Sequence, residues 1–258
     1  MTKGWFAVGL IVGLIGAASL GRSPQAFAQG PAAATKEVRE FEVLLKEKPT
    51  GTTKFTIEQF SDGRTVVATD ALVKVNMVVF NYTYEYHGVE TWVGDRLASF
   101  QCEGSDGGKK FAVNGSVNPA GICQLTVKGK NVPGAAYVMT SNYWRLPIRT
   151  HNGQTLQSVD SSTGVVQKVR INDGVVGRVP LGNQEIAAAE YRLTGDVDVK
   201  LWLDPQGRIV RQQSVEQGYP TELRLLRISR DGGPAGGQPQ FTADQRQQAG
   251  AAAGGIRK

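Results

Sequence analysis

Apolar residues recur at every second position through most of residues 37–230. The alternation is clear in residues 41–45 and again in residues 197–203, where valines and leucines alternate with aspartate, lysine and tryptophan. Successive side chains of a β-strand point to opposite faces, so this period predicts strands with one buried face. Turn sequences at residues 62–63 and 204–207 separate such strands. The pattern therefore predicts an all-β, mainly antiparallel fold, built as one curved sheet or a partial barrel.

One segment departs from the alternation. Within residues 134–144, Ala135, Ala136, Val138 and Met139 have spacings that a helical turn would accept. This spacing predicts a short helix or an ordered crossover between strands.

The first 28 residues have the pattern of a cleavable secretory signal. Lys3 precedes an uncharged apolar stretch from Trp5 to Leu20, and Ala26-Phe27-Ala28 is a small-x-small cleavage triplet. The alternative is a membrane anchor, but a stretch of about 16 residues is shorter than the roughly 20 that a spanning helix needs. We therefore expect a periplasmic or secreted protein that is not integral to the membrane after cleavage.

Composition divides the rest of the chain into three parts. Residues 29–36 are mainly small and are expected to form a linker, and residues 37–230 are expected to form the curved β domain. Glycine, proline, alanine and glutamine dominate residues 231–258, and a segment with so few large apolar residues is expected to be disordered.

The charge balance argues against a nucleic-acid partner. Loss of residues 1–28 removes Lys3 and Arg22 from the 29 basic residues, which leaves 27 against 23 acidic residues, a net charge of +4. Charges also alternate in sign, as in residues 36–40, whereas nucleic-acid-binding proteins concentrate basic charge on one face.

Cys102 and Cys123 both lie in the exported part, where an even number of cysteines favours a disulfide. A plain meander of strands would place them two strands apart, beyond the roughly 7 Å that bridged Cα atoms allow. The disulfide therefore requires a bulge, a bend, or residues 115–122 outside the sheet, and the alternative is two buried thiols.

Catalytic, metal-binding and phosphate-binding motifs are not recognisable in the sequence. His87 and Glu90 have the spacing of one helical turn, but on a strand they would point to opposite faces. We expect no metal and no cofactor. A hydrolase whose site assembles around Glu85, His87 and Glu90 is kept as an alternative.

The most informative cluster is aromatic. Tyr82, Tyr84 and Tyr86 share one strand face, and Trp92 follows with the same parity. These side chains either pack as a sheet core or line a hydrophobic cavity whose polar tips orient a ligand. Trp202 lies on the face that also holds Asp198 and Lys200, so its ring must be covered by something.

These motifs, taken in order, resemble a family of exported bacterial proteins, a domain of unknown function. The resemblance covers nearly all of residues 40–229 and rests on four motifs: residues 41–51, Tyr82-x-Tyr-x-Tyr-x-x-x-Glu-x-Trp92, Asn142-Tyr-Trp144, and residues 191–208. That family is distantly similar to the periplasmic lipoprotein-carrier superfamily. The similarity implies a strongly curved antiparallel sheet with an apolar concave face plugged by helices. This sequence departs from the pattern in its cysteine pair and its tail, and it lacks a lipid-attachment cysteine.

Together these observations predict a non-enzymatic protein that binds an apolar molecule, such as an acyl chain or a lipidated peptide, on the concave face of the sheet. Apolar burial would supply affinity, and hydroxyl, indole and carboxylate groups would orient the ligand. A structural or interaction module of the cell envelope without a ligand is the alternative. The residues expected to contact the ligand are Tyr84, Tyr86, Glu90, Trp92, Trp144 and Trp202.

Overall fold

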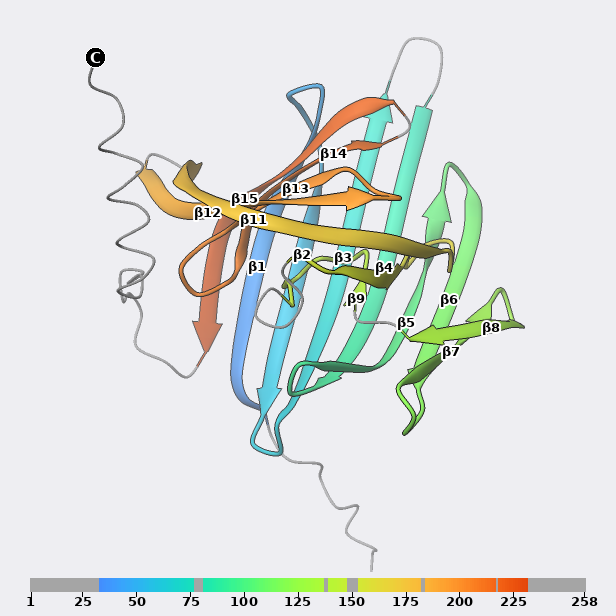
Figure 1. Ribbon diagram of the computed structural model, residues 1–258. Coiled ribbons are helices and arrows are strands. Elements are labelled where there is room, and N and C mark those ends of the chain that lie inside the picture. The colour runs from blue at the N-terminus through green and yellow to red at the C-terminus, as the bar shows by residue number, and fades with distance from the viewer. Residues whose placement is uncertain are drawn as a thin grey trace, which may run out of the picture. The chain divides into compact units, whose positions relative to one another are not determined.

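A computed structural model of the protein describes residues 33–76, 81–136, 139–147, 153–181, 184–216 and 218–231, and all regular secondary structure in these ranges is β-strand (Figure 1). The first eight strands are β1 (Ala33–Leu45), β2 (Lys48–Phe60), β3 (Arg64–Asn76), β4 (Asn81–Val93), β5 (Arg96–Asp106), β6 (Lys109–Val117), β7 (Ile122–Val127) and β8 (Lys130–Ala136). The remaining strands are β9 (Met139–Thr140), β10 (Thr155–Val159), β11 (Val166–Leu181), β12 (Gln184–Gly195), β13 (Val199–Leu203), β14 (Ile209–Glu216) and β15 (Tyr219–Asp231). No helix in these ranges is long and apolar enough to cross a membrane.

The strands form one sheet in the order β8-β7-β6-β5-β4-β3-β2-β1-β15-β14-β13-β12-β11-β10-β9. Every neighbouring pair is antiparallel except β9 with β10, which is parallel. The first and last long strands pair at the middle of the sheet, where Glu37 lies opposite Arg230. The sheet is open, because β8 and β9 are its two end strands.

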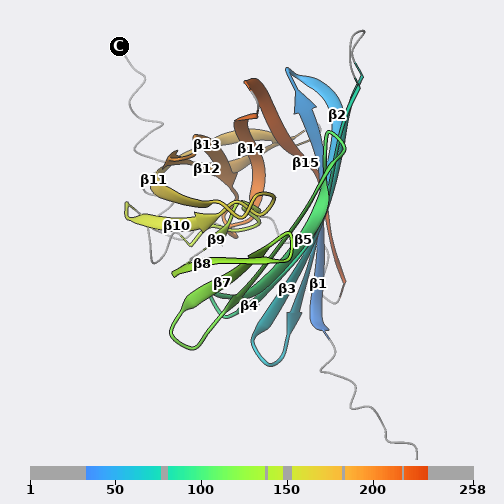
Figure 2. The same ribbon diagram turned by 90° about the vertical axis from the view of Figure 1, so that its right-hand side faces the viewer.

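The two ends of the sheet fold toward each other, so that β10–β14 lie over the concave face of β1–β8 (Figure 2). One buried cluster joins the two halves. It includes Phe55, Val67 and Phe100 from the first half and Ile171, Leu193 and Leu201 from the second. The curved, mainly antiparallel all-β fold that the alternation predicts is thus confirmed, and in β2, β3, β4, β6 and β7 buried residues alternate with more exposed ones.

The expectation of a short helix within residues 134–144 is wrong where the segment is described. Residues 134–136 belong to β8, residues 139–140 form β9, and a turn and bends follow to residue 145. A helix of this length is marginal because few hydrogen bonds repay the cost of nucleation. The crossover alternative holds, since β8 and β9 lie at opposite ends of the sheet.

The expected linker is shorter than the sequence suggested. Strand β1 begins at Ala33, and Lys36 lies opposite Asp231 of β15 and Glu58 of β2. Cross-strand pairing therefore overrides the small-residue composition of residues 33–36. The signal segment and residues 232–258 lie outside the described residues.

Candidate functional site

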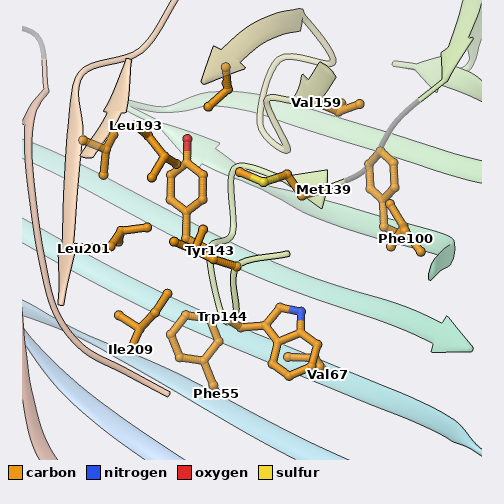
Figure 3. Close-up of a cluster of buried hydrophobic side chains, with 14 of the residues drawn as sticks. Phe55, Val67, Phe100, Met139, Tyr143, Trp144, Val159, Leu193, Leu201 and Ile209 are labelled. Carbon is orange, nitrogen blue, oxygen red and sulfur yellow. The ribbon is translucent and has the colours of Figure 1, made fainter. Parts of the chain in front are cut away.

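A crossover segment, residues 139–147, runs through the interior of the folded sheet. Met139, Tyr143 and Trp144 of this segment lie among core side chains of both halves (Figure 3). Asn142 Nδ2 donates to Thr69 Oγ1 on β3 at 2.8 Å, and the Ser141 and Ser161 hydroxyls lie 3.1 Å apart. The segment therefore divides the space between the two halves of the sheet into two parts.

Glu90, on β4, binds this crossover segment through hydrogen bonds. Its Oε2 accepts hydrogen bonds from Trp92 Nε1 at 2.9 Å and from Trp144 Nε1 at 3.1 Å, and its Oε1 accepts from Thr140 Oγ1. The residue is only 2 % exposed. Burial raises the pKa of the Glu90 carboxyl, and these hydrogen bonds oppose the rise. Glu90 thus serves as an acceptor for donors from segments about 50 residues apart.

The two indole rings form a packed unit. Trp92 and Trp144 meet edge to face with ring centroids 5.8 Å apart. The Arg145 guanidinium lies 4.4 Å from the Trp92 centroid and 4.9 Å from that of Trp144, and it pairs with Asp95 at 3.3 Å. Such cation–π contacts strengthen when water is excluded. The two rings are in direct contact, which leaves no room for a ligand between them.

A cavity of about 580 Å³, which we call the tyrosine cavity, lies on one side of the crossover segment. Its apolar wall comes from β1–β4, from residue 143 of the crossover, from the connection between β12 and β13, and from β13–β15. The apolar and aromatic lining residues are Val43, Leu45, Phe55, Ala71, Val73, Val75, Tyr82, Tyr84, Tyr86, Tyr143, Val197, Val199, Val215, Tyr219 and Leu223. A volume of this size is typical of small-molecule sites.

Three tyrosines form the inner wall of the tyrosine cavity. Tyr86 is buried, and Tyr84 stacks on Phe111 with ring centroids 6.2 Å apart. Tyr143 is only 6 % exposed and has a φ of 33°, in the left-handed region that a β-carbon disfavours. Burial raises the pKa of all three hydroxyls, so they stay protonated and can donate hydrogen bonds at neutral pH.

A second cavity, of about 610 Å³, lies on the other side and has a charged wall; we call it the arginine cavity. Arg39 Nε donates to Glu37 Oε1 at 2.5 Å, and Arg39 Nη1 donates to the Trp144 carbonyl at 2.8 Å. Arg230 also pairs with Glu37, and Arg208 pairs with Asp204 at 2.6 Å. Five basic and four acidic residues line the arginine cavity, and most of them are ion-paired, so both signs of charge lie close together on its wall.

The structure brings some of the expected ligand-contacting residues to a cavity and places others in the packed interior. Tyr84 and Tyr86 line the tyrosine cavity, and Trp144 lines the arginine cavity. Glu90 and Trp92 line neither and take part in the buried network. Trp202 also lines neither, and its ring is covered by the Arg211 guanidinium at 4.8 Å. Whether any of them contacts a ligand stays a prediction.

The carboxylate–histidine site considered for a hydrolase does not assemble. Glu85 and His87 are exposed on the outer face of β4, whereas Glu90 points into the core, as strand parity requires. His87 Nδ1 lies 2.8 Å from Asp70 Oδ1, but this pair is exposed and lines neither cavity.

The expected disulfide is absent: Cys102 and Cys123 are both buried free thiols. Cys102 lies opposite Val113 on β6, and Cys123 on β7 lies opposite Val117, four residues further along β6. Two strand spacings alone separate the cysteines by about 10 Å, more than a disulfide spans. The Cys102 thiol instead donates to the Ser161 carbonyl.

Local sequence analysis missed several lining residues. Asn142, Tyr143, Asp160 and Ser161 lie far along the chain from Tyr84, and nothing in their immediate sequence marks them. The Asn142-Tyr-Trp144 motif indicates a family resemblance but no contact with the tyrosines. It is the crossover through the interior that brings these residues to the tyrosines.

Comparison with known proteins supports the fold and places the chain in a family. The structure is similar to the crystal structure of a β-barrel-like protein of domain of unknown function DUF1849 from Brucella abortus, with a TM-score of 0.58 and 8 % sequence identity; the match covers 78 % of this chain and 100 % of that chain. No curated protein matches the sequence. These matches do not confirm the similarity to lipoprotein carriers, which stays a prediction. The family model of a domain of unknown function, DUF6134, matches residues 41–226, and the chain therefore belongs to that family.

Proposed function

We propose that the protein is an exported, non-enzymatic binding protein that holds a small molecule with an apolar body in the tyrosine cavity. The observation that carries this proposal is the cavity of about 580 Å³ between the two halves of the sheet. Export is expected from the signal pattern of residues 1–28. N-terminal sequencing of the exported protein, expected to begin at Gln29, tests that part.

The lining favours an apolar body with a polar end. Valines, leucines and Phe55 supply surface that gains free energy when a ligand excludes water from it, about 25 cal/mol for each Å². Tyrosine hydroxyls and the Asn142 amide lie on the same wall and can orient a polar group.

Binding can be tested by titrating the mature protein with Nile red, an uncharged dye, and displacing it with dodecan-1-ol. A matched pair of variants locates the site. Ala71 lines the tyrosine cavity and Ala189 lines the arginine cavity, and both are partly buried. Ala71→Phe should fill the tyrosine cavity and weaken binding at least about tenfold, which is roughly 1.4 kcal/mol. Ala189→Phe should leave the dissociation constant unchanged.

The proposal fails if the folded wild-type protein binds neither probe saturably, or if the two variants weaken binding equally. The absence of binding would favour a structural or interaction module of the cell envelope. The filled interior around Glu90 is the observation that favours this second candidate, because it shows how much of the space between the halves is packed.

A further inference from the structure

The charged residues that line the tyrosine cavity are all acidic. The five carboxylates come from β5, β14 and two turns, and no lysine, arginine or histidine lies among the described lining residues. They are Asp106, Asp160, Asp196, Asp198 and Glu216. In a protein with more basic than acidic residues, a wall of one sign is a feature that needs an explanation.

Most of these carboxylates have no cation beside them. Within the described residues an ion pair is found only for Asp198, with the exposed Arg192 at 2.9 Å. Asp160 uses Oδ1 to accept from the Ser162 backbone and hydroxyl and from Thr163 N, and its Oδ2 has no partner in the described part of the chain. Asp106 accepts from the Tyr82 hydroxyl at 2.7 Å. Acceptor capacity is therefore left over at the wall.

Two further polar groups of this wall are unpartnered. Gln167 Oε1 is buried and has no hydrogen-bond partner among the described residues. Tyr143 lines the same cavity and is only 6 % exposed. Its hydroxyl makes no hydrogen bond within the described ranges. A buried acceptor without a donor is costly. A ligand that donates hydrogen bonds would relieve that cost.

The negative charges act on the inner wall of the cavity. Burial raises the pKa of Tyr84, and the charges of Asp160 and Asp106 raise it further. Burial also raises the pKa of Tyr143, and Asp160 and Glu216 add to the rise. Five acidic lining residues and no basic one among the described residues favour a positive group in the cavity.

We propose that the tyrosine cavity binds an amphipathic cation, a molecule with an apolar body and an ammonium head placed near Asp160 and Asp106. This inference rests on the proposed function and names its ligand class. The apolar strands contact the body, the carboxylates pair with the head, and the faces of Tyr84 and Tyr143 offer cation–π contacts. A contact of this kind occurs next to the wall, where Lys46 Nζ, which is not a lining residue, lies 4.5 Å from the ring centroid of the lining residue Tyr219.

A fatty-acid anion fits this cavity poorly. Its carboxylate would face acidic side chains without a basic partner on the described wall, and like charges in a partly desolvated site repel strongly. The ligand is therefore expected to be an amine or a quaternary ammonium compound with an apolar body rather than a fatty acid.

The test compares ligands that share one dodecyl chain, each below its micelle concentration: dodecylammonium, dodecyltrimethylammonium, dodecan-1-ol and dodecanoate. Displacement of Nile red from the mature protein at neutral pH gives the four affinities. We expect both cations to bind about tenfold or more tightly than the alcohol, and dodecanoate to bind most weakly. The preference should shrink as salt screens the charges.

Variants assign the preference to the carboxylates. Asp160→Asn keeps the Oδ1 acceptor for the turn. It should weaken the binding of the two cations several-fold and leave the binding of dodecan-1-ol unchanged. Glu216→Gln, at an exposed position, should do the same to a smaller extent. Asp95→Asn, in the arginine cavity, is the control and should change nothing.

The outcomes separate the two proposals. If dodecan-1-ol binds but the cations bind no more tightly than dodecanoate, the cation inference is overturned and the binding function stands. If none of the four ligands binds, both fail. If the cations bind preferentially but neither acidic variant reduces that preference, the assignment to this wall is overturned.

Discussion

Replacing Glu90 by alanine should destabilise the protein far more than replacing it by glutamine. Alanine removes the acceptor of two buried indole N–H groups, those of Trp92 and Trp144, and of the Thr140 hydroxyl. Glutamine can place its carbonyl oxygen where Oε2 accepts both indoles, and its amide can donate to the Thr140 hydroxyl, which can rotate to accept.

The magnitude follows from the number of donors left without a partner. Each buried donor without an acceptor costs about 1–3 kcal/mol, so the two indoles together cost about 2–6 kcal/mol in Glu90→Ala. Natural domains are stable by only about 5–15 kcal/mol, so this loss can approach the whole stability. The Glu90→Gln change should cost about 1 kcal/mol or less, because the donors stay paired.

Urea denaturation measures both variants, with tryptophan fluorescence reporting the indole environment and circular dichroism reporting the sheet. The pH dependence adds a second check. Burial holds the pKa of Glu90 above its ordinary value of 4.5. At a pH between 4.5 and the raised pKa, the folded protein therefore keeps a proton that the unfolded chain has released. The wild-type protein should therefore lose stability as the pH rises through this window, and Glu90→Gln should lose less.

Equal destabilisation by alanine and glutamine would refute the reasoning. It would mean that the charge, or the shape of the side chain, matters rather than the acceptor oxygens. A Glu90→Ala protein as stable as the wild type would show that the crossover segment is held by packing alone.

Three further predictions use other parts of the fold. Both cysteines should titrate as free thiols in unfolded exported protein. In the folded state they should react slowly, because burial raises the pKa of Cys102 to about 12 and that of Cys123 to about 11. A protein mass two hydrogens lighter than that of the dithiol form would contradict this. Gly115→Ala should cost about 1–3 kcal/mol in urea denaturation, because its Cβ would lie 2.1 Å from the Phe100 ring, whereas Gly177→Ala, which meets nothing within 4 Å, should cost nothing. Glu37→Gln should cost about 3–5 kcal/mol by leaving Arg39 buried without its counterion. Burial alone would raise the pKa of Glu37, but its arginine partners hold that pKa below 4.5. The wild-type protein should therefore lose the stability that the ion pair provides as the pH falls below 4.5, and the Gln variant should not.

The strands could be predicted from the sequence because strand parity is a local property. It correctly placed His87 and Glu90 on opposite faces of β4, and Tyr86 and Trp92 on the same face. Parity could not tell whether an inward aromatic is packed or lines a cavity. Tyr84 borders open space and Trp92 does not, and the difference arises from the crossover segment, which lies about 50 residues further along the chain.

The errors have a related origin. Cys102 and Cys123 suggested a disulfide by their even number and by the expected export of the chain, but the register of β5, β6 and β7 keeps them apart. The helical spacing in residues 134–144 competed with strand pairing and lost. The acidic wall was also hidden, because its carboxylates come from separate turns and strand ends that only the folded sheet brings together.

The pairing of β1 with β15 has a consequence for how the chain reaches its fold. Strands β1 to β8 can form hairpins in order, but one edge of β1 stays unpaired until residues 221–231 are available. An unpaired edge invites pairing with another chain. Contacts that close nearly the whole length of a chain form slowly, because the entropy of the loop is lost first. The sheet is therefore completed only when its last strand is available, and the chain is most vulnerable to aggregation and proteolysis before that point.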